Sequence, residues 1–395
     1  MVLWVRRLGS GKWARGAPGV LQNRAMAYRP LSAVVLAAGE GTRMVSERPK
    51  ALHPLCGRPM VLHVIDSLAE LDPERVVVVV GHGGELVTKA VQAHSARVSF
   101  VEQVERLGTG DALAVALTAF PDAMADELDD GDVVVVPADT PLVQPATLAN
   151  LVRRHRESGA AATLLTAVTD QPRGYGRILR DKEGHVAAIV EEADASEEQR
   201  RINEVATSVY CFRRSVLAPA LRRLSPKNAQ GEYYLTDTVA VLHDAGYPVV
   251  SVACEDPKEV AGVNDRAQLA GAEAELRRRI NERWMRRGVT LVDPASTYID
   301  ASVELGPDVT VHPGSHLVGS TSVGASAEVG PDAYLADTRV GQGAILQRCW
   351  ATQAEVGDRC WVGPYSVLEP GARLAPGTVT GPFFRGRLDG DDALG

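Results

Sequence analysis

The sequence lacks the features that mark membrane proteins and disulfide-stabilised proteins. None of its apolar stretches reaches the ~20 residues that a helix needs to cross a bilayer. Its five cysteines are scattered, odd in number and without a CxxC pair, which is typical of free thiols in a reducing compartment. We therefore expect a cytoplasmic protein whose cysteines serve packing.

The sequence also has no excess of basic residues. It contains 42 Lys and Arg against 50 Asp and Glu, which gives a net charge of −8. Nucleic-acid-binding proteins favour a basic face, so this balance argues against nucleic acid as the main partner. A small anionic substrate remains compatible with it, because a few local cations suffice to bind one.

The first 29 residues differ from the rest because they carry basic residues and no acidic ones. They show no sustained apolar period, and the apolar stretch Val2–Val5 is shorter than the core of a secretory signal. We expect residues 1–29 to form a disordered basic extension. The alternative is a start codon assigned too early, with Met26 as the true start.

Residues 30–263 alternate between short Val/Ile/Leu-rich stretches and longer stretches of helical pattern, such as Met60–Glu70 and Leu142–Ser158. Several of the short stretches are continuous apolar runs, as in strands buried on both faces. The alternation predicts a doubly wound, mostly parallel α/β sheet of Rossmann-like type, which binds ligands at the carboxyl ends of its strands. The expected strands are Ala33–Leu36, Arg75–Val80, Val98–Val101, Val133–Val136, Thr163–Val168, Val186–Val190, Ser208–Phe212 and Val249–Val252.

The pattern changes in the last third of the chain. A charged linker helix is expected within 264–290, and from 291 to 380 apolar residues recur every six positions, with one step of five. A hexapeptide period is typical of a parallel β-helix, and three hexapeptides per coil predict about four coils. Residues 381–395 are expected to be a polar tail. The repeating positions are Leu305, Val311, Leu317, Val323, Val329, Leu335, Val340, Leu346, Val356, Val362, Leu368 and Leu374.

A glycine-spaced basic loop follows the first predicted strand. Gly39 and Gly41 leave backbone N–H groups open to a phosphate, and Arg43 and Lys50 add positive charge. The spacing is not that of Walker A, and Met44 breaks the G-x-G-x-x-G pattern. The loop indicates a phosphorylated ligand, with an ordinary tight turn as the alternative.

This stretch also carries a family resemblance. LAAGEGTRM (36–44) and PKALHPLCGRPM (49–60) resemble the nucleotidyltransferases that join a nucleoside triphosphate to a sugar 1-phosphate. The closest resemblance is to the GlmU family of bifunctional N-acetylglucosamine-1-phosphate uridyltransferases and glucosamine-1-phosphate acetyltransferases. Further motifs follow in order over about residues 30–380: QVERLGTGDAL (103–113), ADTPL (138–142), GYGRI (174–178), IVEEADAS (189–196), NAQGEYYLTD (228–237) and GVNDR (262–266).

The resemblance implies a nucleotidyltransferase domain at 30–263, a short left-handed β-helix at 291–380, and roles for individual residues. It places catalytic and phosphate-neutralising functions on Arg43, Lys50 and Asp139. It places a magnesium ion on Asp139 and Asn264, and the amino sugar near Gly176, Glu191 and Thr207. The remaining nucleotide-binding positions are Leu36, Ala37, Ala38, Gly39, Gln103, Gly108 and Thr109.

The implied reaction is magnesium-dependent uridylyl transfer from UTP to N-acetylglucosamine 1-phosphate. The sugar phosphate oxygen would attack the α-phosphorus in line, and pyrophosphate would leave. Such a transfer depends mainly on positioning and charge neutralisation, so no side-chain nucleophile is required. The product, UDP-N-acetylglucosamine, would supply peptidoglycan and cell-envelope synthesis.

Elementary chemistry agrees with these assignments at Asp139. This residue follows the expected strand Val133–Val136, where doubly wound folds bind ligands. Magnesium takes few protein oxygens and keeps phosphate and water as its other ligands, which suits one carboxylate and one amide. Simpler alternatives are that Asp139 caps the next helix, that Asn264 is a turn residue and that Glu191 is surface charge.

Three positions depart from the family pattern. Ala138 stands where glycine usually precedes the metal-binding aspartate, and Ser208 replaces another glycine. Ala206 stands where an asparagine would contact the amino sugar. Losing such a hydrogen bond typically weakens binding by about 1 kcal/mol or more, so these departures leave the identity of the sugar open.

The chain also stops before the later β-helix coils that carry the acetyltransferase residues in bifunctional members. The segment GPYSVLEPG (363–371) lacks the expected arginine. We therefore expect no acetyltransferase activity, and a homotrimer formed through the β-helix. Two alternatives to the uridyltransferase hypothesis are transfer to a different sugar 1-phosphate and a non-catalytic nucleotide-binding regulator; the second conflicts with the retained Arg43, Lys50, Asp139 and Asn264.

Overall fold

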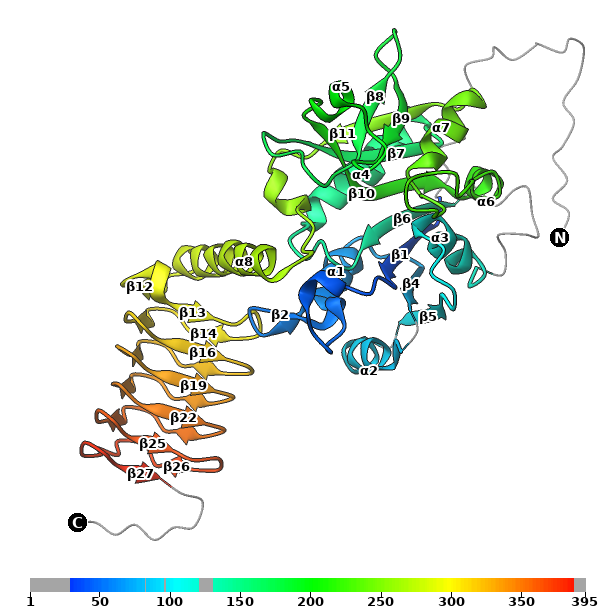
Figure 1. The fold of residues 1–395 in the computed structure, drawn as a ribbon. Coiled ribbons are helices and arrows are strands. Elements are labelled where there is room, and N and C mark those ends of the chain that lie inside the picture. The colour runs from blue at the N-terminus through cyan, green and yellow to red at the C-terminus, as the bar shows by residue number, and fades with distance from the viewer. Residues whose placement is uncertain (1–28, 82, 96, 121–130, 387–395) are drawn as a thin grey trace, which may run out of the picture.

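The computed structural model describes residues 29–81, 83–95, 97–120 and 131–386. An α/β unit comes first, the long helix α8 (Arg266–Arg286) follows it, and a column of short strands completes the chain (Figure 1). The predicted basic extension, apart from Arg29, and the last nine residues of the predicted tail lie outside the described residues.

The α/β unit is built on one twisted sheet with strand order β11-β7-β10-β6-β1-β4-β5. Neighbouring strands are parallel except at β10, which runs antiparallel to both β6 and β7. β8 pairs with β10 and β9 at the side of this path. The strands are β1 (Leu31–Ala37), β4 (Arg75–Val80), β5 (Val98–Glu102), β6 (Asp132–Pro137), β7 (Ala162–Val168), β8 (Arg177–Arg180), β9 (Val186–Val190), β10 (Glu204–Arg213) and β11 (Val249–Ala253).

Helices cover both faces of the sheet, which confirms the doubly wound prediction and explains the continuous apolar runs. Along β1, Ala33 and Val35 pack into one core and Val34 packs into the other, so consecutive residues are all buried. The first core is closed by α1 (Met60–Ala69), α2 (Glu85–His94) and α4 (Pro145–Ser158). The second is closed by α3 (Thr109–Leu117), α6 (Arg214–Leu221) and α7 (Asp237–Asp244).

The sequence pattern did not reveal some short elements. β8 begins and ends with arginine and has one intermediate and one exposed residue at its end, so it lacks the apolar run of the central strands. The hairpin of β2 (Pro54–Leu55) and β3 (Arg58–Pro59) is two residues long on each side. α5 (Glu197–Arg200) is a single turn closed by a Ser196–Gln199 capping box.

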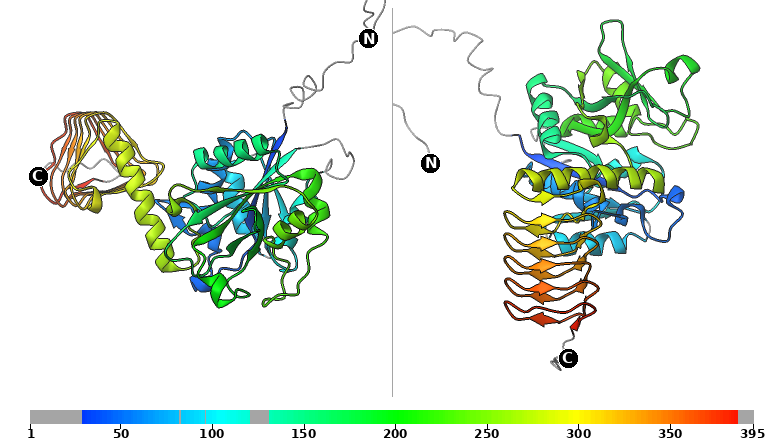
Figure 2. Two further views of the ribbon diagram at one scale, coloured as in Figure 1. Left: turned by 90° about the horizontal axis from the view of Figure 1, so that it is seen from above. Right: turned by 90° about the vertical axis from the view of Figure 1, so that its left-hand side faces the viewer.

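The second unit is the predicted parallel β-helix. Its strands form three sheets of five, six and five strands, and the coils stack into a column beneath α8 (Figure 2). Its strands are β12 (Thr290–Leu291), β13 (Tyr298–Ile299), β14 (Glu304–Leu305), β15 (Thr310–Val311), β16 (His316–Val318), β17 (Ser322–Val323), β18 (Glu328–Val329), β19 (Tyr334–Ala336), β20 (Arg339–Val340), β21 (Ile345–Leu346), β22 (Trp350–Thr352), β23 (Glu355–Val356), β24 (Trp361–Val362), β25 (Val367–Leu368), β26 (Arg373–Leu374) and β27 (Arg385–Gly386).

The repeating apolar positions line the inside of this column, as Leu317 and Leu335 do with no exposure. The stack is about one coil longer than predicted, because β12 begins before the first recognised repeat and β27 lies beyond residue 380. One repeat was missed between Leu346 and Val356. Its inward residue is the small Ala351, which is fully buried in β22.

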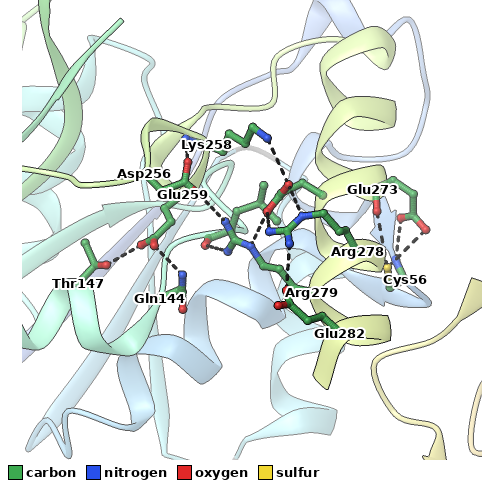
Figure 3. A network of polar contacts seen from close by, with 12 residues as sticks. Cys56, Gln144, Thr147, Asp256, Lys258, Glu259, Glu273, Arg278, Arg279 and Glu282 are labelled. Carbon is green, nitrogen blue, oxygen red and sulfur yellow. Dashed lines mark hydrogen bonds and ion pairs between the residues drawn. The ribbon is translucent and has the colours of Figure 1, made fainter. Parts of the chain in front are cut away.

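A polar network connects α8 to the α/β unit (Figure 3). Arg279 donates to Glu275 Oε1 at 2.9 Å and to the Leu142 carbonyl at 2.8 Å. Hydrogen bonds from Arg278 and Arg279 lower the pKa of Glu275 to about 2, so this carboxylate stays charged at neutral pH. These contacts hold α8 against the segment that follows β6.

The β2–β3 turn contacts both α8 and the first coil of the β-helix. The Cys56 N–H donates to Glu273 Oε2 at 2.7 Å, and the Cys56 carbonyl accepts from the Ala301 N–H at 2.9 Å. Gly57 has φ +79°, and a Cβ there would lie 2.2 Å from Asp300 Oδ2. Only glycine therefore fits this close approach, which ties the α/β unit to the β-helix.

The cysteines and the helix lengths agree with the first expectations. All five cysteines are buried and free, in keeping with a role in packing. Within the described ranges, no helix is both long enough and apolar enough to cross a membrane.

Candidate functional site

A cavity of about 770 Å³ opens at the carboxyl ends of β1 and β6. Every residue that the sequence predicted for the site lines this cavity, except Gly176. The lining includes Leu36, Ala37, Ala38, Gly39, Arg43, Lys50, Gln103, Gly108, Thr109, Asp139, Glu191, Thr207 and Asn264. Gly176 lies just behind the wall, where a Cβ would come within 3.5 Å of Glu191 Oε2.

The basic loop folds because glycine permits a left-handed turn against Lys50. Gly41 has φ +65°, and a Cβ there would lie 2.5 Å from Lys50 Cβ. The turn leads into a 3₁₀ helix, Thr42–Met44, which carries Arg43. Gly39 has open space around its Cα. The loop therefore brings two cations to one side of the cavity and leaves room beside its backbone.

The charged centre of the site is a cluster of four side chains. Lys50 Nζ donates to Asp139 Oδ2 and, at 2.9 Å, to Asn264 Oδ1. Arg43 Nη2 donates to the same Asn264 oxygen at 3.0 Å. The Val263 N–H donates to the Asp139 carbonyl at 2.8 Å, which places Asn264 beside Asp139. Residues distant in sequence thus meet around a single ammonium group.

This arrangement tests whether the site fits a divalent cation. Asp139 Oδ2 and Asn264 Oδ1 both contact one cationic atom, Lys50 Nζ, so one cation can reach both oxygens. Within the described residues there is no cluster of three or more His, Cys, Asp or Glu side chains suited to a metal. A carboxylate and an amide fit a hard ion that takes its other ligands from phosphate and water.

The side of the cavity that the sequence predicts for the nucleotide is built around Gln103 and the start of α3. Gln103 Nε2 donates to the Gly108 carbonyl at 3.0 Å and to Asp111 Oδ2 at 2.7 Å. Gly108 has φ +112°, and any Cβ there would collide with the backbone of Tyr233. Thr109 Oγ1 accepts from the Leu235 N–H at 3.0 Å. The two bonds from Gln103 Nε2 fix the orientation of its amide. Its Oε1 atom is therefore the one available to a ligand.

Glu191 is held in the opposite wall and is not a solvated surface charge. Its Oε1 accepts a hydrogen bond from Thr236 Oγ1 at 2.9 Å. Burial raises the pKa of the Glu191 carboxyl, and the nearby charges of Asp237 and Asp194 add to this effect. A carboxylate in this setting gains from a ligand hydroxyl that donates to it.

The irregular strand β10 forms the wall next to Glu191. Thr207 lines the cavity, but its hydroxyl donates to the Leu165 carbonyl at 2.7 Å and so serves the backbone. Ser208 lines the cavity with φ +61°, which explains why glycine is usual there. Ala206 lies in the core with 5% exposure and does not line the cavity. Ala138 lines the cavity as a buried residue whose N–H donates to the Leu36 carbonyl.

The structure also decides against one simpler alternative for Asp139. The next helix, α4, begins at Pro145 with Gln144 as its N-cap, so Asp139 does not cap it. Asn264 precedes Asp265, the N-cap of α8, and its N–H donates to Gln268 Oε1 at 2.7 Å. The Asn264 side chain nevertheless faces the cavity. Its backbone can therefore serve the turn while its side chain is available for binding.

Several lining residues were not singled out from the sequence. Most lie within or beside motifs that were recognised as whole segments, so the motif NAQGEYYLTD (228–237) was the available signal. Arg106 and Glu40 form an ion pair at the rim of the cavity. The missed residues include Glu40, Arg106, Arg173, Tyr175, Tyr210, Gln230, Glu232, Tyr234, Leu235, Thr236 and Gln268.

Comparison with known proteins decides the family. The domain described as a MobA-like NTP transferase domain matches residues 33–241. The chain is 44% identical over 352 residues to the bifunctional protein GlmU of Heliobacterium modesticaldum, covering 89% of this chain and 75% of the relative. The GlmU proteins of Streptomyces avermitilis and Rhodococcus jostii are each 46% identical, over 90% and 89% of this chain and 73% and 70% of theirs. The chain belongs to the GlmU family.

Membership of the GlmU family makes this chain a sugar-1-phosphate nucleotidyltransferase, as the ordered motifs predicted. The matched domain spans all strands of the sheet except β11, from β1 to α7. The roles of individual residues and the identity of the substrates remain predictions, which the geometry above makes specific.

The raised pKa of Glu191 gives the first test. Because the pKa of Glu191 is raised in the folded protein, ionising this carboxyl opposes folding. The protonated form contributes its full stability below pH ~4.3, the pKa of an unfolded glutamate. This contribution is lost as the pH rises through the folded pKa. Glu191→Gln should therefore raise Tm at pH 7.5 by about 2–4 °C and raise it less at pH 5. Scanning fluorimetry across this range measures the difference.

The neighbouring Glu192 supplies the control. Desolvation raises the pKa of Glu192, but the hydrogen bond and charge of Arg177 outweigh this effect and lower the pKa. Glu192→Gln should therefore destabilise the protein at pH 7.5 and do so less at lower pH. A Glu191→Gln variant that is no more stable than wild type at pH 7.5 would contradict the burial argument.

Proposed function

We propose that this protein transfers a uridylyl group from UTP to N-acetylglucosamine 1-phosphate, with magnesium, to give UDP-N-acetylglucosamine and pyrophosphate. The observation that carries the proposal is the cluster in which Lys50 contacts both Asp139 and Asn264. It gathers the charges that a triphosphate and a divalent ion require at the carboxyl end of β6, where such folds bind ligands.

The hydrogen bonds of Gln103 support uracil as the base. Because both bonds from its Nε2 stay within the protein, its Oε1 is the group available to the base. Uracil presents an N3–H donor to such an acceptor, whereas cytosine presents a lone pair at N3. A fixed acceptor disfavours the partner that cannot donate to it, so UTP is favoured over CTP.

Arg43 and Lys50 are the groups that would meet the phosphates. In the present arrangement both donate to Asn264 Oδ1. A triphosphate offers these cations several charged oxygens, so on binding they would turn toward it and release the oxygens of Asp139 and Asn264. These oxygens would then hold Mg²⁺, which supplies charge neutralisation at the phosphates when bound.

On the sugar side, Glu191 would accept a hydroxyl of the hexose, and β10 would form the wall. Transfer to a different sugar 1-phosphate is a second candidate, because Ala206 lies in the core and offers no side-chain hydrogen bond. In either case we place the protein in the cytoplasm and in the supply of peptidoglycan and cell-envelope precursors. The absence of acetyl transfer stays a prediction.

The proposal is tested by pyrophosphate release with UTP, magnesium and a panel of sugar 1-phosphates. N-acetylglucosamine 1-phosphate should be turned over, and UTP should be preferred to CTP. Asp139→Ala should lower kcat/KM by about 100-fold or more, because it removes charge from the reacting centre. The matched control is Asp170→Ala, which removes an exposed carboxylate outside the cavity lining and should leave the rate unchanged.

Two other results would redirect the proposal. Turnover of another sugar 1-phosphate alone would keep the reaction and move its specificity. Folded wild-type protein that binds UTP but releases no pyrophosphate with any sugar would contradict catalysis and favour the regulator, with Ala138→Gly as the first reversion to make.

The position of Lys50 predicts how metal and nucleotide compete. Without nucleotide, the Lys50 ammonium group occupies the two oxygens that would hold the ion. Lys50→Met should therefore bind Mn²⁺, used as a magnesium probe, several-fold more tightly than wild type when no UTP is present. Calorimetry measures this directly, with Lys182→Met in the β8–β9 turn as control. Weaker Mn²⁺ binding by Lys50→Met would show that the lysine does not mask the metal ligands.

We also propose that the β-helix mediates a homotrimer. The outward residues Tyr298, His316, Tyr334 and Trp350 form an aromatic face along one sheet, with ring centroids 3.9 to 6.2 Å apart. Trp350 is 53% exposed, and exposed apolar faces of this kind mark protein interfaces. Light scattering should give the mass of three chains, and Trp350→Glu should reduce it. An unchanged mass would place the interface elsewhere.

A further inference from the structure

One hydroxyl in the cavity wall has no assigned function. Tyr210, on β10, lines the cavity, and its ring packs in the core with a stacked contact to Phe212 at 5.4 Å. Its hydroxyl oxygen is buried and has no hydrogen-bond partner among the described residues. Since buried hydroxyls are nearly always paired in native proteins, this group is expected to have a partner that the protein chain does not supply.

The other hydroxyls of this wall are already used within the protein. Thr207 donates to the Leu165 carbonyl, Thr236 donates to Glu191, and the Tyr234 hydroxyl donates to Gln230 Oε1 at 2.8 Å. Among the described residues of this wall, Tyr210 is therefore the buried hydroxyl that keeps its donor free. A free donor on a rigid ring is well placed to select a ligand.

The surroundings of Tyr210 indicate what kind of ligand this is. Burial raises the pKa of the Tyr210 hydroxyl, and the charge of Glu191 raises it further, so the phenol stays protonated and acts as a donor. Glu191, which lines the same cavity, is an acceptor. A donor and an acceptor on one wall suit a neutral polyhydroxylated ring, which offers both kinds of group.

The buried position of Ala206 leaves a need for such a donor. Its methyl group lies in the same core as the Tyr210 ring, so this position gives no polar contact to the cavity. Ser208 is exposed and turned by its left-handed backbone. The sugar wall of β10 therefore has one buried donor, and it belongs to Tyr210.

We propose that the Tyr210 hydroxyl donates a hydrogen bond to an oxygen of the hexose in the sugar 1-phosphate and is a specificity-determining residue of this enzyme. The inference rests on the proposed function, because it assigns the sugar to this wall.

The test is the isosteric variant Tyr210→Phe, which keeps the ring and removes only the oxygen. With the sugar 1-phosphate that the wild type turns over fastest, KM for the sugar should rise about tenfold, and KM for UTP should not change. Tm should stay equal or increase, because the variant loses a buried hydroxyl without a protein partner. Calorimetry of the same sugar 1-phosphate should show a matching loss of affinity.

The matched control is Tyr247→Phe, which removes a hydroxyl from a residue that is 42% exposed and outside the cavity lining. Unchanged sugar KM and sugar affinity in Tyr210→Phe, with wild-type turnover, would overturn the inference and leave the proposed function intact. A fall in Tm without a change in sugar KM would assign the hydroxyl to structure and also overturn it. Wild-type protein that neither turns over nor binds any sugar 1-phosphate would overturn both proposals.

Discussion

The site depends on one ammonium group, Lys50 Nζ, which holds oxygens from two distant parts of the chain. Asp139 is 89 residues away in sequence and Asn264 is 214 residues away. The Lys50 and Asp139 side chains are only 14% and 26% exposed, so their attraction is screened less than that of a surface pair. The basic loop after β1, the end of β6 and the start of α8 must all be correctly folded before this contact can form.

The same contact links the chemistry to the architecture, because α8 begins immediately after Asn264. Asp265 caps the helix by accepting from the Gln268 N–H, and Gln268 in turn accepts from the Asn264 N–H. Farther along the helix, Glu273 binds the β2–β3 turn that also contacts the first coil. Helix α8 thus runs from the candidate metal ligands to the first coil of the β-helix, and it contacts both units.

Much of this arrangement could be predicted because local sequence patterns determine it. The central strands are continuous valine runs, and the six-residue period places one buried residue in each short strand. The direction of β10 could not be predicted, because its apolar pattern is the same whichever way the strand runs. The repeat at Ala351 was missed because a small residue fills the column there.

The candidate site shows the same division between local signals and three-dimensional ones. Arg43, Lys50 and Asp139 stand in recognisable motifs beside predicted strands. Tyr210 looks like an ordinary apolar strand residue in the sequence, since only the packing around it shows that its hydroxyl is buried without a partner. Gly176 was assigned to the sugar pocket; only the structure shows that a Cβ there would lie 2.7 Å from Ile189 Cγ2.

The charge cluster and the proposed sugar wall also differ in how strongly their residues depend on one another. Lys50 contacts both Asp139 and Asn264, so replacing Lys50 leaves the charge or hydrogen-bonding capacity of its partners uncompensated. The wall lies on β10, where the pairing with β7 shifts register between Ala206 and Tyr210. Ser208 keeps a left-handed backbone inside this irregularity, at a cost of about 1–2 kcal/mol that glycine would avoid. Strain retained where a side chain meets the cavity is typical of functional positions, so we place the determinants of sugar preference on this strand and those of the transfer reaction on the cluster.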